Sequence, residues 1–202
     1  MESVAALQRT DMKVFLESPD LLETVVAEGE KNSVAARELV NQLNDAQLNW
    51  KPSPDSWSIA QCLEHLTVST EKFGQYFTRA IAQGREKRTT ESAPAYRPSF
   101  MGGWLIRHLL PEVTRKMSAP KILRPAASQI DHALEKFLTE QEKFLEFVRT
   151  SKGIDYNKTR LRSPVTPLVR YSLADAYVLT VVHGQRHLAQ ARRVRDTPGF
   201  PN

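Results

Sequence analysis

Apolar residues recur along this chain at spacings of three, four or seven, the period of a helix with one buried face. The spacing predicts four long helices, over about residues 19–43, 58–84, 128–150 and 172–196. Polar and apolar residues alternate over no useful length, so the predicted fold class is all-α. The predicted apolar faces consist, helix by helix, of Leu22, Val25, Gly29, Ala36, Val40 and Leu43; Ile59, Leu63, Leu66, Phe73, Phe77 and Ile81; Ile130, Leu134, Phe137, Phe144, Leu145 and Val148; and Leu173, Tyr177, Thr180, Gly184, Leu188 and Ala191.

Residues typical of helix ends accompany these patterns. The first helix is predicted to begin with Ser18 as its N-cap and Pro19 in the first helical position. Gly153 is expected to end the third helix. The other three helices each start with a capping-box pattern, a serine followed three residues later by Gln or Asp: Ser58 and Gln61, Ser128 and Asp131, and Ser172 and Asp175.

Two of the three segments that connect the helices have a distinctive composition. Residues 44–57 contain two prolines and two tryptophans and are predicted to form an ordered loop. Residues 85–127 form a longer excursion, polar at first and then apolar in FMGGWLIRHLL, which could make a short helix before Pro111. The apolar part could cover the chain's own domain, contact a partner subunit or touch a membrane, and we favour the first.

Composition limits the class of protein. The chain has 202 residues, of which 41% are hydrophobic, as expected for one domain with a real core. Glu2, Asp11 and Lys13 interrupt the first twenty residues, so these cannot serve as a secretory signal, and no stretch is long and apolar enough to cross a bilayer. The only cysteine, Cys62, cannot form an internal disulfide, which favours a cytoplasmic location and places any metal on His, Asp or Glu.

Charge is divided between the two ends of the chain. Residues 151–202 contain nine Lys or Arg against three Asp or Glu, whereas residues 1–50 contain four against nine. The first and last helices are therefore expected to attract each other within one domain. The net charge of +5 alone does not indicate nucleic-acid binding, because no dense basic run or interleaved aromatic platform accompanies it.

Three histidines are candidates for metal ligands. His183 and His187 are four residues apart on the predicted fourth helix, so both imidazoles lie on one face and can reach one ion. His65, on the second helix, would need a hydrogen-bond partner if buried, and coordination supplies one. Three such ligands leave coordination positions for water or substrate, as in catalytic metal sites. A pair spaced H-x-x-x-H also occurs among ordinary surface or core histidines, so that interpretation stays open.

Other residues of chemical interest have less support. His108 and His132 lie away from the candidate ligands and are expected to be structural or solvated. Cys62 is expected to be a small core residue. Glu64 follows Leu63 on the same helix but points about 100° away from His65, so it is not taken as a ligand. Arg170 and Arg186 could bind a substrate carboxylate, although neither is assigned to the site.

Several segments together resemble one family. The runs LNDAQLNWKPSPDSWSIAQCLEHL and YSLADAYVLTVVHGQRHLAQARRV, with the closing PGFP, resemble the DinB/YfiT-like superfamily, a metal-binding group distinct from the DNA polymerase that shares its name. The resemblance implies an up-down-down-up four-helix bundle with a long crossover between helices two and three. It divides the chain into an N-terminal extension, residues 1–16, and a DinB-like domain, residues 17–202.

The resemblance also implies a function. It places one zinc or nickel ion on His65, His183 and His187, and members of the family are often dimers. Some members resemble transferases that use a low-molecular-weight thiol, and others hydrolyse or isomerise. We therefore expect a metal-dependent enzyme that directs an activated thiol or water at an electrophilic small molecule, without nucleic acid or membrane as partner and with a possible homodimer. The alternatives are a non-catalytic module stabilised by metal and a stress-associated protein that contacts DNA.

Overall fold

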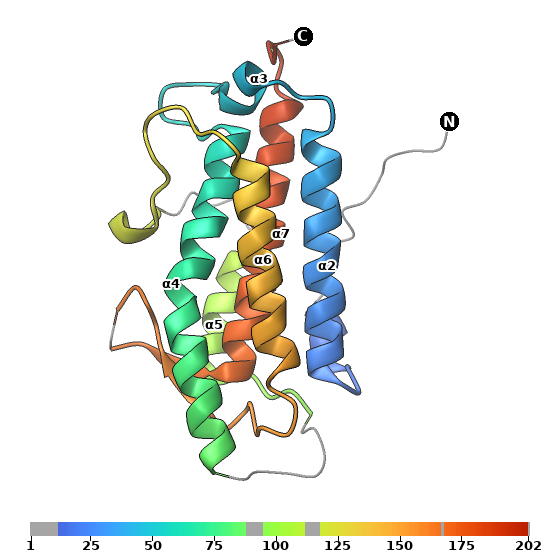
Figure 1. Cartoon of the computed structure of the whole chain (residues 1–202), viewed down its shortest axis with the longest axis vertical. Helices are drawn as coiled ribbons and strands as arrows, with labels where there is room; N and C mark the ends of the chain where they lie inside the picture. Colours follow the sequence, from blue (N-terminus) through green and yellow to red (C-terminus); the bar gives the residue numbers. More distant parts are fainter. Residues whose placement is uncertain (1–11, 88–94, 112–117, 167, 202) are drawn as a thin grey trace.

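Four long helices lie side by side along the longest axis of the molecule (Figure 1). The structure is a computed structural model and describes residues 12–87, 95–111, 118–166 and 168–201. The long helices are α2 (Leu21–Val40), α4 (Ile59–Glu86), α6 (Ala133–Arg149) and α7 (Leu173–Arg195). Helix α7 packs against α2 and α4, and α6 packs against the same two helices on their other side. The mainly helical structure confirms the all-α class.

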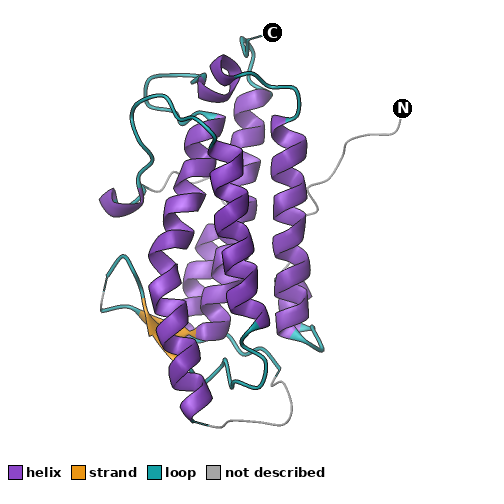
Figure 2. Cartoon of the chain, viewed as in Figure 1, coloured by secondary structure: helices purple, strands orange, loops and turns teal. Residues whose placement is uncertain are grey.

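Short elements occupy the ends and the sides of this four-helix arrangement (Figure 2). They are α1 (Lys13–Leu16), α3 (Asp45–Asn49), α5 (Phe100–Leu109), the 3₁₀ helix η1 (Lys121–Leu123), and the strands β1 (Arg160–Arg162) and β2 (Arg170–Ser172). The two strands pair antiparallel, with Leu161 opposite Tyr171. Each strand has only three residues, too few for an alternating pattern to be recognised in the sequence.

Helix starts agree with the sequence at two of the four long helices. Ser58 and Ser172 cap α4 and α7, each in a complete capping box. For α2 the prediction was wrong, because the Asp20 side chain, rather than Ser18, accepts the backbone N–H groups of Leu22 and Glu23. The third helix also begins later than predicted, at Ala133. Its N-cap is His132, whose backbone is left-handed with a φ of 56°.

Apolar side chains form two clusters between the helices. One contains Phe77, Phe144 and Tyr177, and the other contains Leu63, Phe137 and Leu188. Along α4, His65 lies between Leu63 of the second cluster and Phe77 of the first, so the candidate site lies near the junction of the clusters. Helix α1 buries Phe15 completely in the first cluster. The predicted domain boundary at residue 16 stays a prediction, and residues 1–11 lie outside the described part.

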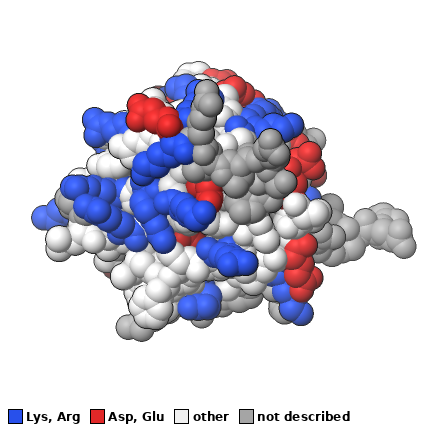
Figure 3. All heavy atoms as spheres, turned by 90° about the horizontal axis from the view of Figure 1, so that it is seen from below, with Lys and Arg blue, Asp and Glu red and all other residues white. Residues whose placement is uncertain are grey.

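The first and last long helices do pack together, since α2 contacts α7 along the bundle. Arg195 near the end of α7 donates a hydrogen bond of 2.8 Å to the Leu39 carbonyl of α2. On the lower end of the molecule, Lys and Arg side chains gather on the left and in the middle of the face, and Asp and Glu side chains lie mainly along its top and right (Figure 3). Among the described residues, each helix is too short or too polar to cross a lipid bilayer.

The excursion is fastened to the start of α7 by the carboxylate of Asp175, which is 1% exposed. The Tyr96 hydroxyl donates to Asp175 Oδ1 at 3.0 Å, and the backbone N–H of Ser99 donates to the same carboxylate at 3.2 Å. Asp175 also completes the capping box by accepting from the Ser172 N–H at 3.1 Å. Gly102 of α5 lies so close to this carboxylate that no Cβ fits there. Asp175 therefore fixes α5 against α7.

We expect Asp175→Ala to lower the free energy of unfolding by about 2–4 kcal/mol, because it removes the acceptor of the Ser172 N–H in the capping box and leaves the buried Tyr96 hydroxyl without its acceptor. Tyr96→Phe, which removes one hydrogen bond and keeps the ring, should cost about 0.5–1.5 kcal/mol. Urea denaturation followed by circular dichroism measures both. Asp45→Ala, at an exposed position of α3, is the control. A loss for Asp175→Ala no larger than that for Asp45→Ala would contradict the anchoring role.

Candidate metal centre

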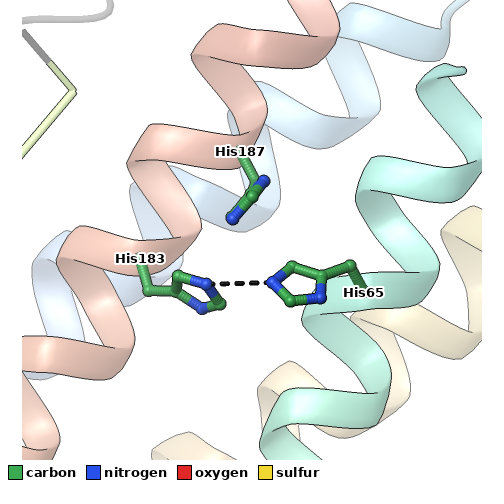
Figure 4. A group of neighbouring side chains, drawn as sticks. All are labelled: His65, His183 and His187. Atoms are coloured by element: carbon green, nitrogen blue, oxygen red, sulfur yellow. Dashed lines mark hydrogen bonds between the residues drawn. The ribbon is translucent and has the colours of Figure 1, made fainter. Parts of the chain in front are cut away.

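The three predicted histidines come together in the structure, one from α4 and two from α7 (Figure 4). His183 and His187 lie one turn apart on α7 and face His65 on α4. Each offers one ring nitrogen, and these three nitrogens lie within 4.8 Å of one another. The Nε2 atoms of His65 and His183 are 3.1 Å apart. The geometry expected from the helical spacing is therefore present.

Hydrogen bonds at the far side of two rings determine which nitrogen faces the centre. The Nδ1–H of His65 donates to the Leu123 carbonyl at 2.6 Å, and the Nδ1–H of His187 donates to the Gln190 Oε1 at 3.0 Å. A neutral imidazole with its proton on Nδ1 has its lone pair on Nε2. This is the arrangement of a metal-ligating histidine whose other nitrogen is held by the surrounding protein.

The donor set fits a divalent ion. Two nitrogens each about 2.0–2.1 Å from zinc in a tetrahedral shell are roughly 3.3 Å apart. The separation of 3.1 Å between the Nε2 atoms of His65 and His183 is close to this value. Imidazole nitrogen is also a preferred ligand of nickel, so the donors alone do not distinguish the two metals. His65, His183 and His187 could thus hold one ion.

Burial keeps the three rings neutral. It lowers the pKa of His65, lowers that of His183 to about 3, and moves that of His187 well below its ordinary value. The positive charge of Arg186 lowers the pKa of His183 and His187 further, which places this guanidinium near both rings. All three lone pairs are consequently available at neutral pH without the loss of a proton.

The second half of the excursion supports the centre from the side of α4. Besides the bond from His65 to Leu123, the Gln61 side chain donates to the Ala126 carbonyl at 2.8 Å. The Glu64 carboxylate accepts the Ala126 N–H at 2.6 Å. Three side chains of α4 thus hold residues 123–126 in place. Glu64 is occupied outside the centre, in agreement with its exclusion as a ligand.

Trp57, from the ordered loop before α4, covers the rings. Its indole is stacked on His187, with ring centres 5.6 Å apart and an interplanar angle of 28°. It is tilted against His65 at 4.9 Å. An apolar ring at this position limits the access of water to two of the three imidazoles. The sequence placed Trp57 next to the capping residue Ser58 but did not indicate this contact.

Gly184 follows His183 directly on α7, and with Thr180 it lines the space beside the three rings. Its backbone also lies close to α2, because a Cβ on Gly184 would lie 2.5 Å from the Asn32 Nδ2 of that helix. The Asn32 amide donates to the Val181 carbonyl at 3.0 Å. Gly184 therefore permits the close approach of α2 and α7.

The remaining candidates lie apart from the three rings or serve other contacts. The Nδ1–H of His108 donates to the Trp104 carbonyl of its own helix, and His132 pairs with Glu135. Burial raises the pKa of the Cys62 thiol to about 12, so it is a core group rather than a thiolate. Arg170 is on the exposed side of β2, whereas Arg186 donates to the Leu110 carbonyl at 3.1 Å.

A large cleft adjoins the centre. Its volume is about 1160 Å³, and its walls include all three histidines and Trp57. One wall comes from the excursion, through Leu105 and Leu109 of α5 and through Leu123. A small molecule of considerable size can therefore reach the imidazoles. One face of α5 thus covers its own domain, while Phe100 and Trp104 on the other face are exposed.

Comparison with known proteins identifies a family. The sequence model of the DinB superfamily matches residues 30–191, well over half of the chain, and the match includes the three histidines. It bears out the resemblance seen in the sequence. Neither the curated proteins nor the solved structures yielded a match.

We expect the purified chain, prepared without a histidine tag, to bind one zinc or nickel ion per molecule. His65→Ala, His183→Ala and His187→Ala should each lower the bound metal to a small fraction, because each removes one of three donors. Mass spectrometry of the metal content after gel filtration measures this. His108→Ala, outside the centre, is the matched control. Folded wild-type protein that takes up neither ion would contradict the assignment.

Gln190 provides a finer test, because it contacts the centre only through His187. Gln190→Ala leaves the three donors in place and removes the acceptor of the His187 Nδ1–H. Such a change typically weakens metal binding by about 10–100-fold. Competition with a chromophoric chelator gives the affinity, and Gln190→Glu, which keeps an acceptor, should restore it. An unchanged affinity in Gln190→Ala would show that this hydrogen bond does not orient the ligand.

Proposed function

We propose that this chain, which belongs to the DinB superfamily, is a metal-dependent enzyme acting on a small molecule. In this proposal His65, His183 and His187 hold one zinc or nickel ion, and the reaction joins an activated low-molecular-weight thiol or water to an electrophilic substrate. One observation carries the proposal: three neutral imidazole nitrogens converge within 4.8 Å in the wall of a cleft of about 1160 Å³.

A divalent ion bound by these residues would lower the pKa of a thiol or water in its remaining coordination position. Three histidines favour this chemistry in two ways. They supply fewer ligands than a closed structural site, which has four, so one position stays accessible. They are also neutral, so they do not offset the charge of the ion as thiolate or carboxylate ligands would.

The surrounding residues prepare the site. The Leu123 carbonyl and the Gln190 amide orient the rings of His65 and His187 before any ligand arrives. Trp57 packs against the same two rings and lines the cleft together with them. Preorganised groups in a partly dehydrated site act more strongly on charge than the same groups in water.

We further propose the bundle topology of the family. The course of the chain in Figure 1 supports it: α2 and α7 run towards the end that carries α3, and α4 and α6 run away from it. Helices α4 and α6 are parallel, so a long connection must return along their length. Residues 87–132 make this connection and contain α5 and η1.

A second candidate function is a non-catalytic module that is stabilised by metal and acts by binding a partner. The outer face of α5 favours it, since Phe100, Met101 and Trp104 are 87%, 37% and 44% exposed. A second copy of the chain is the partner we propose for this face, in line with the homodimer expected from the family. A cytoplasmic location, and small molecules rather than nucleic acid or membranes as ligands, belong to the same proposal.

Activity assays distinguish the two functions. We expect the zinc- or nickel-loaded protein to accelerate conjugation of 1-chloro-2,4-dinitrobenzene with at least one of bacillithiol, mycothiol, glutathione and cysteine, or hydrolysis of 4-nitrophenyl acetate. Chelation should abolish the acceleration, and His183→Ala should lower kcat/KM by about 100-fold or more, the size expected for loss of the group that activates the nucleophile. His108→Ala should keep full activity.

Thermal unfolding completes this comparison. For a non-catalytic module, metal raises the melting temperature by binding the folded state, and chelation reverses the rise without any activity to lose. Turnover that survives chelation, or no turnover with every thiol and ester while metal still stabilises the fold, would reject the enzyme and favour the module.

A further inference from the structure

The cleft beside the histidines has a charged part and an apolar part. Its charged lining is mostly basic, from Lys51, Arg124, Arg186 and Arg193, with Asp55 as the one carboxylate among the described lining residues. Such an excess of positive charge around a concave site attracts anions.

Two of these arginines lie on α7 close to the imidazoles. Arg186 directly precedes His187 and is partly buried. Arg193 is six residues beyond His187, about 9 Å further along the helix. Seven residues, about two helical turns, separate Arg186 and Arg193, so both lie on one side of α7, and both line the cleft. An anionic group beside them could accept charge-assisted hydrogen bonds from these guanidinium groups.

On the other side of the histidines, the lining includes a group of apolar side chains. On α7, Leu179 precedes His183 by four residues, about 6 Å along the axis. Leu179 belongs to the first apolar cluster, and four further lining residues pack against that cluster: Phe73 of α4, Leu105 and Leu109 of α5, and Val169 just before β2. In order along α7, the cleft therefore presents Arg193, then His187, Arg186 and His183, and then Leu179.

We infer that the cleft binds an elongated organic anion, with its carboxylate or phosphate beside Arg186 and Arg193 and its hydrocarbon portion against Leu179 and α5. The reactive part of such a molecule would lie between these two ends, next to the histidines. Such anions would be the substrate class of the proposed enzyme. Only their designation as substrates rests on the proposed function. Binding itself requires only the lining residues.

Binding of simple probes to the chelated, metal-free protein tests the inference by calorimetry. We expect octanoate and octyl phosphate to bind at least fivefold more tightly than octanol. Octanoate should also exceed butanoate, because each buried methylene adds to affinity. Arg193→Gln, at an exposed position, and Arg186→Gln should each weaken octanoate binding about fivefold or more, the effect of losing one charge-assisted hydrogen bond, and leave octanol within twofold. Arg192→Gln, a neighbour outside the cleft, is the control.

The apolar end has its own pair of variants. Leu109→Ala should reduce the advantage of octanoate over butanoate, whereas Trp104→Ala, on the exposed face of the same helix, should not. Equal affinities for octanoate and octanol, or octanoate binding unchanged in both arginine variants, would overturn the inference.

Repeating the titrations with metal separates this inference from the proposed function. Octanoate binding that requires the metal and is unchanged in Arg186→Gln and Arg193→Gln would overturn the inference. The proposed metal site would not be affected by that result. Protein that takes up no metal but prefers octanoate through its arginines would reject the enzyme and retain the anion-binding cleft.

Discussion

Two imidazole nitrogens with lone pairs directed at each other repel unless a proton or a cation lies between them. The structure holds the Nε2 atoms of His65 and His183 at 3.1 Å, and the hydrogen bond from the His65 Nδ1–H to the Leu123 carbonyl keeps the first lone pair pointing inward. Burial keeps the rings neutral, since it lowers the pKa of all three. In the neutral state this pair of nitrogens can form one hydrogen bond, from the His183 Nε2–H to the His65 Nε2, or can bind one cation with both lone pairs.

Helix α7 contributes most of the residues that surround this pair of nitrogens. It supplies two of the rings, and its two faces have different tasks: Gly184 admits Asn32 and brings α2 close, while Arg186 and His187 face the cleft. Its first turn also holds the excursion, through the buried carboxylate of Asp175. The helix is thus positioned by polar contacts that differ from those of the site, so stability and chemistry can be perturbed separately.

The sequence allowed the helices and the three histidines to be predicted, because both depend on periodicity. Spacing of four residues is enough to bring His183 and His187 to one face, and apolar spacing places His65 beside a core. The hydrogen bond from His65 to the Leu123 carbonyl could not be predicted, because every residue has a backbone carbonyl and the residue type does not indicate which one accepts. Helix α3 was missed although Asn44 and Gln47 form a capping box, because five residues are too few to show a period. The start of α6 was misplaced because the left-handed His132 ends an irregular stretch that resembles a helix start in sequence.

The excursion between α4 and α6 connects these features. A parallel pair of helices needs a long return segment. In this chain the segment also contacts the candidate site: the Leu123 carbonyl of η1 orients His65, and α5 contributes apolar residues to the wall of the cleft. The orientation of a candidate metal ligand and the shape of the cleft are consequently set by the same connection. Since Gln61, Glu64 and His65 all bind residues 123–126, a displacement of this segment would turn the His65 ring and widen the cleft together. The crossover is therefore a functional part of the site as well as a requirement of the topology.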